Sequence, residues 1–198
     1  MNGISVKDDV DVSVQSRIRE LDAAEASVTR DHKRRLAALN DLFRNGALPE
    51  SGLDGRCRGK LVALDIAPGF TQLFNSITAS WMPWLGKTFD AAHQTGENIF
   101  TRDSYLLARF FNPLYRGFKI EGDTYRGFAF RTFSAPGLMD PDRSVLKIDY
   151  DLHENPSLTV RRVLDELVQV DRDTYLGKAH VRWWWGNWQT VAYFVLSK

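Results

Sequence analysis

The stretch Lys178–Leu196, KAHVRWWWGNWQTVAYFVL, decides which fold this sequence can adopt. It predicts a hairpin, because Gly186-Asn187 suits a two-residue type II′ turn between two strands. Side chains alternate between the two faces of a strand, so this turn fixes which residues share a face. One face is apolar and holds small residues beside tryptophans: Gly177, Ala179, Val181, Trp183, Trp185, Trp188, Thr190, Ala192 and Phe194. We therefore expect this face to lie in the core.

The opposite face of the hairpin combines cations with large apolar side chains: Lys178, His180, Arg182, Trp184, Gln189, Val191, Tyr193 and Val195. An ordinary solvent-facing surface seldom gathers so many apolar residues in one row. Two interpretations stay open at this stage. Either the N-terminal helix covers this face, or the face lines a semi-polar cavity.

The strand before the hairpin brings a carboxylate to this second face. If the preceding loop has four residues, Asp165 lies opposite His180. With a three-residue loop, Glu166 faces Lys178 and lies diagonal to His180, because a slip of one residue exchanges the two faces. A carboxylate beside imidazole orients the ring and stabilises its charged form, which suits a general acid or base. The alternative is a structural ion pair on the surface of the sheet.

Composition limits what the chain can do. Its 198 residues suit one domain with an arm, and its formal net charge of +1 gives no overall field for nucleic acid or an anionic membrane, although a local basic patch stays open. The single cysteine, Cys57, excludes an intrachain disulfide and a multi-thiolate metal site. No cofactor-binding or metal-binding motif occurs, so we expect neither a cofactor nor a metal. With no apolar run of about 18 residues and no secretory signal, we expect a cytoplasmic protein without a membrane span.

Residues 13–45 predict a long helix, since apolar side chains recur at spacings of three and four among charged ones. We expect residues 1–48 to form an N-terminal helical arm that packs on the rest of the protein. The nearly heptad spacing leaves a homodimer through this helix as the alternative. In that case the protein would act in assembly through the arm.

Residues 49–198 predict a barrel-like domain. Short strands follow one another at close spacing, with turn residues between them, as in a barrel or a strongly curved sheet. Short helices are expected near residues 68–81 and 103–111. The strands are expected at residues 59–66, 86–91, 115–120, 124–134, 145–152, 163–170, 175–185 and 188–197. The predicted fold class is α+β, with an N-terminal helix packed on a mostly antiparallel, barrel-like sheet.

Four short runs resemble segments of uncharacterised bacterial lipocalin-like proteins: WLGKTF at 84–89, DELV at 165–168, YLGK at 175–178 and VAYF at 191–194. The resemblance spans residues 53–198. It implies a calycin-type barrel that holds a small, largely apolar molecule, and it carries over no catalytic residue. The expected helices depart from a plain eight-stranded lipocalin barrel.

Two functions follow from these observations. The first is the binding or carriage of a small hydrophobic or aromatic metabolite in a barrel cavity, by Trp81, Trp84, Tyr150, Lys178, Arg182 and Trp184. The alternative is a cofactor-free isomerase or cyclase in the same cavity. There, His180 with Asp165 or Glu166 would move a proton, and Tyr193 or Arg182 would stabilise an oxyanion.

Overall fold

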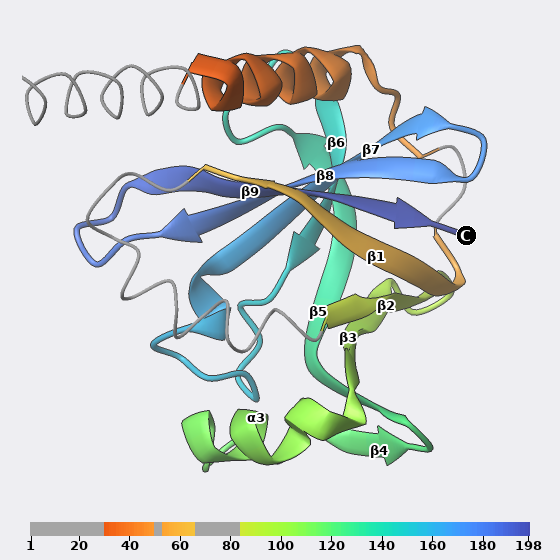
Figure 1. The fold of residues 1–198 in the computed structure, drawn as a ribbon, viewed down its shortest axis with the longest axis vertical. Helices are drawn as coiled ribbons and strands as arrows, with labels where there is room; N and C mark the ends of the chain where they lie inside the picture. Colours follow the sequence, from red (N-terminus) through yellow and green to blue (C-terminus); the bar gives the residue numbers. More distant parts are fainter. Residues whose placement is uncertain (1–29, 50–52, 66–83) are drawn as a thin grey trace, which may run out of the picture. The chain divides into compact units, whose positions relative to one another are not determined.

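The computed structural model describes residues 30–49, 53–65 and 84–198 of the chain (Figure 1). The chain divides into two compact units, Met1–Asn40 and Asp41–Lys198, and the second contains the whole sheet. A helix occupies residues 30–45 of the described part. Among the described helices, none has the length and apolar character needed to cross a membrane. The predicted division at residue 48 and the predicted homodimer stay predictions, and the helix expected over 68–81 lies outside the described residues.

The sheet closes into an antiparallel barrel. Its strands are β1 (Gly55–Leu64), β2 (Trp84–Asp90), β3 (Thr95–Thr101), β4 (Lys119–Glu121), β5 (Thr124–Pro136), β6 (Ser144–Asp149), β7 (Val163–Asp171), β8 (Thr174–Arg182) and β9 (Trp188–Ser197). They lie in the order β3-β2-β1-β9-β8-β7-β6-β5, and β5 pairs with β3 to close a ring of eight. β4 is an extra strand that pairs with β5 outside this ring. The predicted fold class is confirmed.

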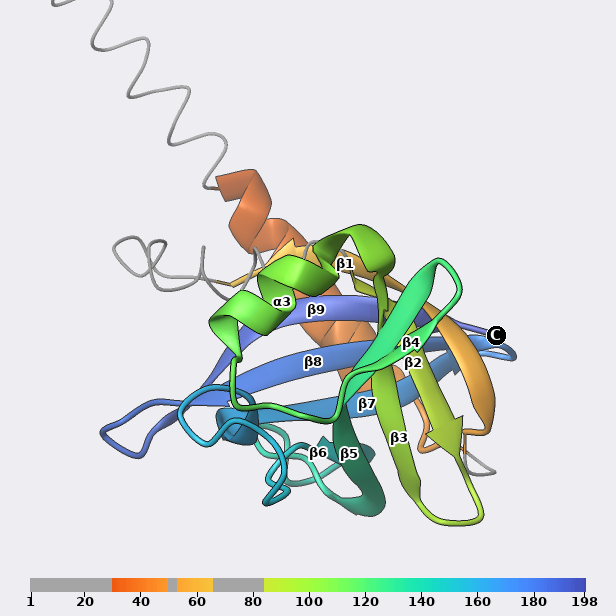
Figure 2. The same cartoon turned by 90° about the horizontal axis from the view of Figure 1, so that it is seen from below.

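Strand β3 was not expected from the sequence. Its run TGENIFT places polar residues where a strand usually carries β-branched or aromatic ones. It forms a strand because it pairs on one side with β2 and on the other with β5. After it, a single 3-10 turn (η1, Arg102–Ser104) leads into helix α3 (Tyr105–Phe111), which ends where Asn112 Nδ2 donates to the Ala108 carbonyl (Figure 2).

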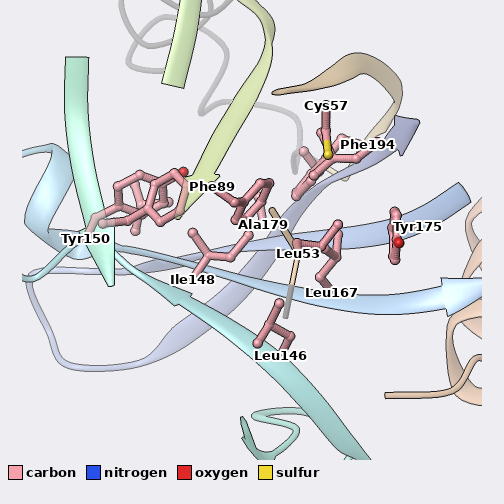
Figure 3. Packing of buried hydrophobic residues seen from close by; sticks show 14 of the residues in the cluster. Leu53, Cys57, Phe89, Leu146, Ile148, Tyr150, Leu167, Tyr175, Ala179 and Phe194 are labelled. Atoms are coloured by element: carbon pink, nitrogen blue, oxygen red, sulfur yellow. The ribbon is translucent and has the colours of Figure 1, made fainter. Parts of the chain in front are cut away.

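The barrel is filled by side chains from its alternating inward positions. Ile148, Leu167, Ala179 and Phe194, from four different strands, point into one buried cluster (Figure 3). Cys57 belongs to the same cluster, and burial raises the pKa of its thiol. A buried thiol whose pKa is raised is a poor nucleophile, so Cys57 serves the packing of the core. A second cluster, Phe100, Ala108, Tyr115, Tyr125 and Phe128, joins α3 to one end of the barrel.

The predicted register between β8 and β9 is wrong. The hairpin loop runs from Trp183 to Asn187, and the first strand pair is Arg182 with Trp188. A turn closes earlier than expected, because the Gly186 amide donates to the Trp183 carbonyl at 2.9 Å. Of the three consecutive tryptophans, Trp183 is buried whereas Trp184 and Trp185 are exposed.

A β-bulge in β9 compensates for the shifted start. His180 pairs with Thr190, but the next pair along is Ala179 with Ala192, so Val191 is the extra residue. The bulge turns both Val191 and Ala192 into the core cluster. It also leaves Thr190 beside His180 on the outer face of the barrel.

Candidate functional site

A buried hydrogen-bond network crosses the interior of the barrel. The ammonium group of Lys87 on β2 lies 2.9 Å from Asp165 Oδ2 on β7 and donates to Asn98 Oδ1 on β3 at 2.9 Å. It also donates to the hydroxyl of Tyr150, the residue after β6. An ammonium group has three hydrogens, and these three partners use all of them. Four different parts of the barrel are therefore joined at one buried nitrogen.

Aromatic rings surround the same ammonium group. Its nitrogen lies 5.1–5.5 Å from the ring centres of Trp84, Phe130, Tyr150 and Phe194. Rings at this distance attract a cation through their negative faces, most strongly when water is excluded. The aromatic residues thus offset part of the cost of burying the charge.

A bulge at Gly86 explains why Trp84 and Lys87 both face inward. The pairing of β2 with β3 shifts between Trp84 and Gly86, which brings two residues with an odd spacing to the same face. Gly86 has a φ of +138°, and a Cβ on it would lie 2.0 Å from the Cys57 carbonyl oxygen. Only glycine fits this conformation and this approach. The sequence Trp-Leu-Gly-Lys therefore carries the local geometry of the site.

Burial changes the acid–base properties of the network. Desolvation lowers the pKa of Lys87, and the charge of Asp165 only partly opposes this. Desolvation, together with the charge of Asp165, raises the pKa of Tyr150 well above its ordinary value. The Tyr150 hydroxyl consequently stays protonated at neutral pH. It donates a hydrogen bond to Asp165 Oδ2 at 3.1 Å. The second oxygen of Asp165 is buried and makes no hydrogen bond within the described structure.

A small cavity adjoins this network. Its volume is about 30 Å³, and its walls are Trp84, Asn98, Phe100, Phe128, Tyr150, Val160 and Val163. A space of this size has room for about one or two water molecules. Five of its walls are apolar, and the edges of Asn98 and Tyr150 supply its polar part. Phe100 and Phe128 also pack with Ala108 of α3, so the cavity lies at the end of the barrel that α3 closes.

The predicted pair of His180 and a carboxylate exists, but on the outside of the barrel. Glu166 pairs with Lys178, so the register of the interpretation with Glu166 is confirmed, although the loop has two residues and not three. Asp165 pairs with Ala179, so the interpretation with Asp165 opposite His180 is wrong. His180 Nε2 lies 3.2 Å from Glu166 Oε2, and both side chains are fully buried. His180 points outward because its neighbour Ala179 fills the barrel core.

Glu166 collects several further partners. The Leu138 amide donates to its Oε1 at 2.6 Å, and the Lys147 ammonium forms an ion pair with the same oxygen. Burial alone would raise the pKa of Glu166, but the adjacent His180 side chain and its charge, together with the hydrogen bonds from Lys147 and Leu138, lower it to about 2. The carboxylate is therefore ionised throughout the neutral range and serves as the fixed counter-charge of this outer cluster.

Lys178 is buried beside this cluster by the end of the N-terminal helix. Its ammonium group donates to Asp140 Oδ2 at 2.6 Å and lies 4.3 Å from the centre of the Phe43 ring. Arg44 binds the other oxygen of Asp140. Tyr193 is buried in the same row, and burial together with the charges of Asp65 and Asp140 raises its pKa to about 12. Of the two interpretations of this face, coverage holds at the end of the helix, where Phe43 lies over Lys178.

The other predicted site residues lie in different places. Arg182 and Trp184 are exposed at the end of the β8–β9 hairpin, where each makes a cation–π contact, with Trp188 and Arg162 respectively. Trp81 lies outside the described residues. Trp84, Tyr150 and Asp165 are therefore the predicted residues that the structure brings together inside the barrel. Functional roles for the residues outside it stay predictions.

The sequence interpretation missed Lys87, Asn98 and the apolar walls of the cavity. Lys87 could have been found, because it lies two residues before Phe89 on a predicted strand. Residues at this spacing share one face of a strand, so Lys87 points to the same side as an apolar residue. Asn98 could not, since no strand was predicted for residues 95–101. In the part of the chain that the structure describes, no three His, Cys, Asp or Glu side chains gather as a metal site would require.

Comparisons with known proteins add little to this geometry. No protein-family model and no curated protein matches the chain. A crystal structure of a protein from Thermomonospora curvata is similar to it with a TM-score of 0.46 and 15% sequence identity, covering 85% of this chain and 98% of that one. A likeness this distant carries no argument about function.

Proposed function

We propose that the barrel binds a small, largely apolar molecule in the cavity beside Trp84. One observation supports this most: an apolar hollow with two polar edges adjoins a buried hydrogen-bond network inside a closed barrel. Sites for small molecules are usually concave and mostly apolar, with a few polar groups that fix the orientation of the ligand. Small barrels of eight strands have room for one such ligand.

The hydrogen-bond inventory favours an uncharged ligand. The three hydrogens of Lys87 are used, and both amide hydrogens of Asn98 are directed at the Phe128 carbonyl and the Tyr150 hydroxyl, at 3.2 Å each. An anionic ligand would meet no spare donor from these groups and would lose its hydration on entry. A neutral apolar molecule is therefore a more suitable ligand for this cavity than an anionic one.

Trp84 is the wall that a larger ligand would displace. Its side chain is half-buried, and its Nε1 donates a single hydrogen bond to Asn98 Oδ1 at 3.1 Å. In this proposal, a ligand larger than the present cavity breaks this bond and moves the indole outward. Asn98 keeps Lys87 as a donor to the same oxygen, so the network survives the movement.

No observation favours the isomerase or cyclase alternative in the same cavity. His180, Glu166 and Tyr193 lie on the outer face of the barrel, separated from the cavity by the wall of the sheet. Asp165 is the one member of the predicted catalytic set that points inward, and it faces Lys87.

Native mass spectrometry of the protein from its own host tests the proposal. We expect a small-molecule adduct on the natural protein. Val163→Phe fills the cavity and should remove the adduct, whereas Val195→Phe, on the outer face of β9, is the matched control and should keep it. An adduct that persists in a folded Val163→Phe protein would place the ligand elsewhere.

A further inference from the structure

A threonine, a histidine and a glutamate meet on the outer face of the barrel. Thr190 Oγ1 lies 3.1 Å from His180 Nδ1, and His180 Nε2 lies 3.2 Å from Glu166 Oε2. The three residues come from β9, β8 and β7, which are neighbouring strands (Figure 2). A hydroxyl within reach of an imidazole, with a carboxylate at the other ring nitrogen, is the arrangement that activates a hydroxyl nucleophile.

The β-bulge in β9 creates the contact between Thr190 and His180. Ala179 pairs with Ala192. A regular ladder would then place Val191 opposite His180, but Thr190 takes this position instead. The bulge therefore exchanges an apolar side chain for a hydroxyl beside the imidazole. Bulges often redirect a side chain in this way next to an active site.

Glu166 fixes the position of the hydrogen on the neutral imidazole. With a pKa of about 2, the carboxyl group of Glu166 is ionised at neutral pH and acts only as an acceptor. The hydrogen of the neutral ring is therefore favoured on Nε2, which leaves Nδ1 as the acceptor for the Thr190 hydroxyl. His180 and Glu166 are fully buried, whereas Thr190 is partly exposed. The base is thus shielded from water, while the hydroxyl lies at the surface.

The next outward pair along the same two strands adds a positive charge and an apolar wall. Arg182 pairs with Trp188, and each lies two residues from His180 or Thr190 on the same face. Arg182 is exposed, and its guanidinium group lies 5.7 Å from the centre of the Trp188 ring. A cation suits the oxyanion that forms when a hydroxyl attacks a carbonyl carbon. The indole offers an apolar surface to an acyl group.

From this geometry we propose that Thr190 is the nucleophile of a site that hydrolyses carboxylic esters with a small apolar acyl group. Thr190 Oγ1 forms a bond to the carbonyl carbon, and its proton passes to His180 Nδ1. The bond between that carbon and the alcohol oxygen then breaks, and the alcohol leaves with the proton. Water, deprotonated by the same nitrogen, attacks the acyl group, releases the acid and restores the hydroxyl. This activity goes beyond ligand binding in the cavity and does not depend on it.

The ester p-nitrophenyl acetate tests the proposal on the full chain. We expect the natural protein to release p-nitrophenol and to carry an acetyl group on Thr190, located by peptide mass spectrometry after an acid quench. Thr190→Val keeps the shape of the side chain and removes the hydroxyl, so release above the rate in buffer should fall at least about a hundredfold. Thr190→Ser should restore the acetylation that Thr190→Val loses. His180→Gln should prevent acetylation of Thr190, because the base is lost.

Thr174→Val is the matched control. Thr174 is also a partly exposed threonine, but it begins β8 at the end remote from the hairpin with β9. The control protein should release p-nitrophenol at the natural rate, and both valine variants should show unchanged circular dichroism. Release at the natural rate by a folded Thr190→Val protein would overturn the proposal, as would acetyl groups confined to lysines. Neither result would affect the ligand adduct expected from the cavity.

Discussion

The Lys87 ammonium lies 2.9 Å from Asp165 Oδ2 inside the barrel, with side chains only 2% and 0% exposed. The two residues come from β2 and β7, which have three strands between them along the sheet and therefore face one another across the barrel. A charge this deeply buried is tolerated because its three hydrogens, its counter-charge and the surrounding rings compensate for lost hydration. Through its hydrogen bonds, Lys87 holds Asn98 and Tyr150, which supply the polar edges of the cavity.

Replacing one partner of this pair should be costly. Lys87→Met leaves the Asp165 carboxylate buried without its counter-charge, and we expect the free energy of unfolding to fall by about 3–5 kcal/mol. Urea denaturation measures this. Lys87→Met combined with Asp165→Leu removes both charges and should recover much of the loss. A Lys87→Met protein as stable as the natural one would contradict the buried pair.

Acid should weaken the outer cluster in a defined pH range. Glu166 has a pKa of about 2 in the folded protein against an ordinary value of 4.5. A lowered carboxyl pKa stabilises the fold above pH 4.5, and this stabilisation, about 3 kcal/mol, is lost as the pH falls from 4.5 to about 2. Urea unfolding across this range measures the effect. The difference in free energy of unfolding between the natural protein and Glu166→Gln should shrink by that amount as the pH falls.

The control for this pH dependence is Glu154→Gln, which replaces an exposed glutamate. Its stability difference from the natural protein should change little over the same range. A Glu166→Gln protein whose unfolding followed the natural pH curve would show that Glu166 is not the group responsible.

The end of the N-terminal helix should hold the outer face closed. Phe43 is fully buried over the Lys178 ammonium, whereas its neighbour Leu42 is about half exposed. We expect Phe43→Ala to lower the free energy of unfolding by about 3–5 kcal/mol, since it leaves a cavity above a buried charge. Leu42→Ala should cost less than about 1 kcal/mol. Equal effects in thermal unfolding would show that Phe43 does not cover this face.

Gly86 should be irreplaceable, unlike Gly122. Both have positive φ, but a Cβ at Gly86 meets backbone within 3 Å and one at Gly122 meets nothing within 4 Å. We expect Gly122→Ala to cost about 1 kcal/mol, from backbone strain alone. Gly86→Ala should cost at least about 3 kcal/mol, because a backbone clash is added to the strain. Chemical denaturation compares the two, and similar losses would contradict the role given to the bulge.

The sequence predicted much of the barrel because alternation and turn residues are local signals. It placed the strand that contains Lys87 and the strand that contains Glu166, and it paired Glu166 with Lys178 as one of two registers. It missed β3, since Thr95, Glu97 and Asn98 become strand residues only through partners on both sides. Closure of a barrel depends on such pairing between distant segments, which no local pattern contains.

The site was harder to predict for the same reason. Lys178 and His180 looked like groups that line a cavity, because an exposed row rarely carries so many apolar neighbours. Lys178 is buried instead under Phe43 and Asp140, which lie far away in the sequence, and His180 is buried beside Glu166. The single-residue bulge at Val191 also changed which side chains of β9 face inward. Neither effect is visible in the hairpin sequence alone.

A crystal of the protein pressurised with xenon tests most directly whether the cavity beside Trp84 accepts a small apolar molecule. Apolar cavities stay free of water and bind xenon, whereas polar ones retain ordered water. We predict a xenon atom among Trp84, Phe100, Phe128 and Val163, and its absence in the Val163→Phe protein. A water molecule held by Asn98 and Tyr150, with no xenon at that position, would contradict the proposed ligand site.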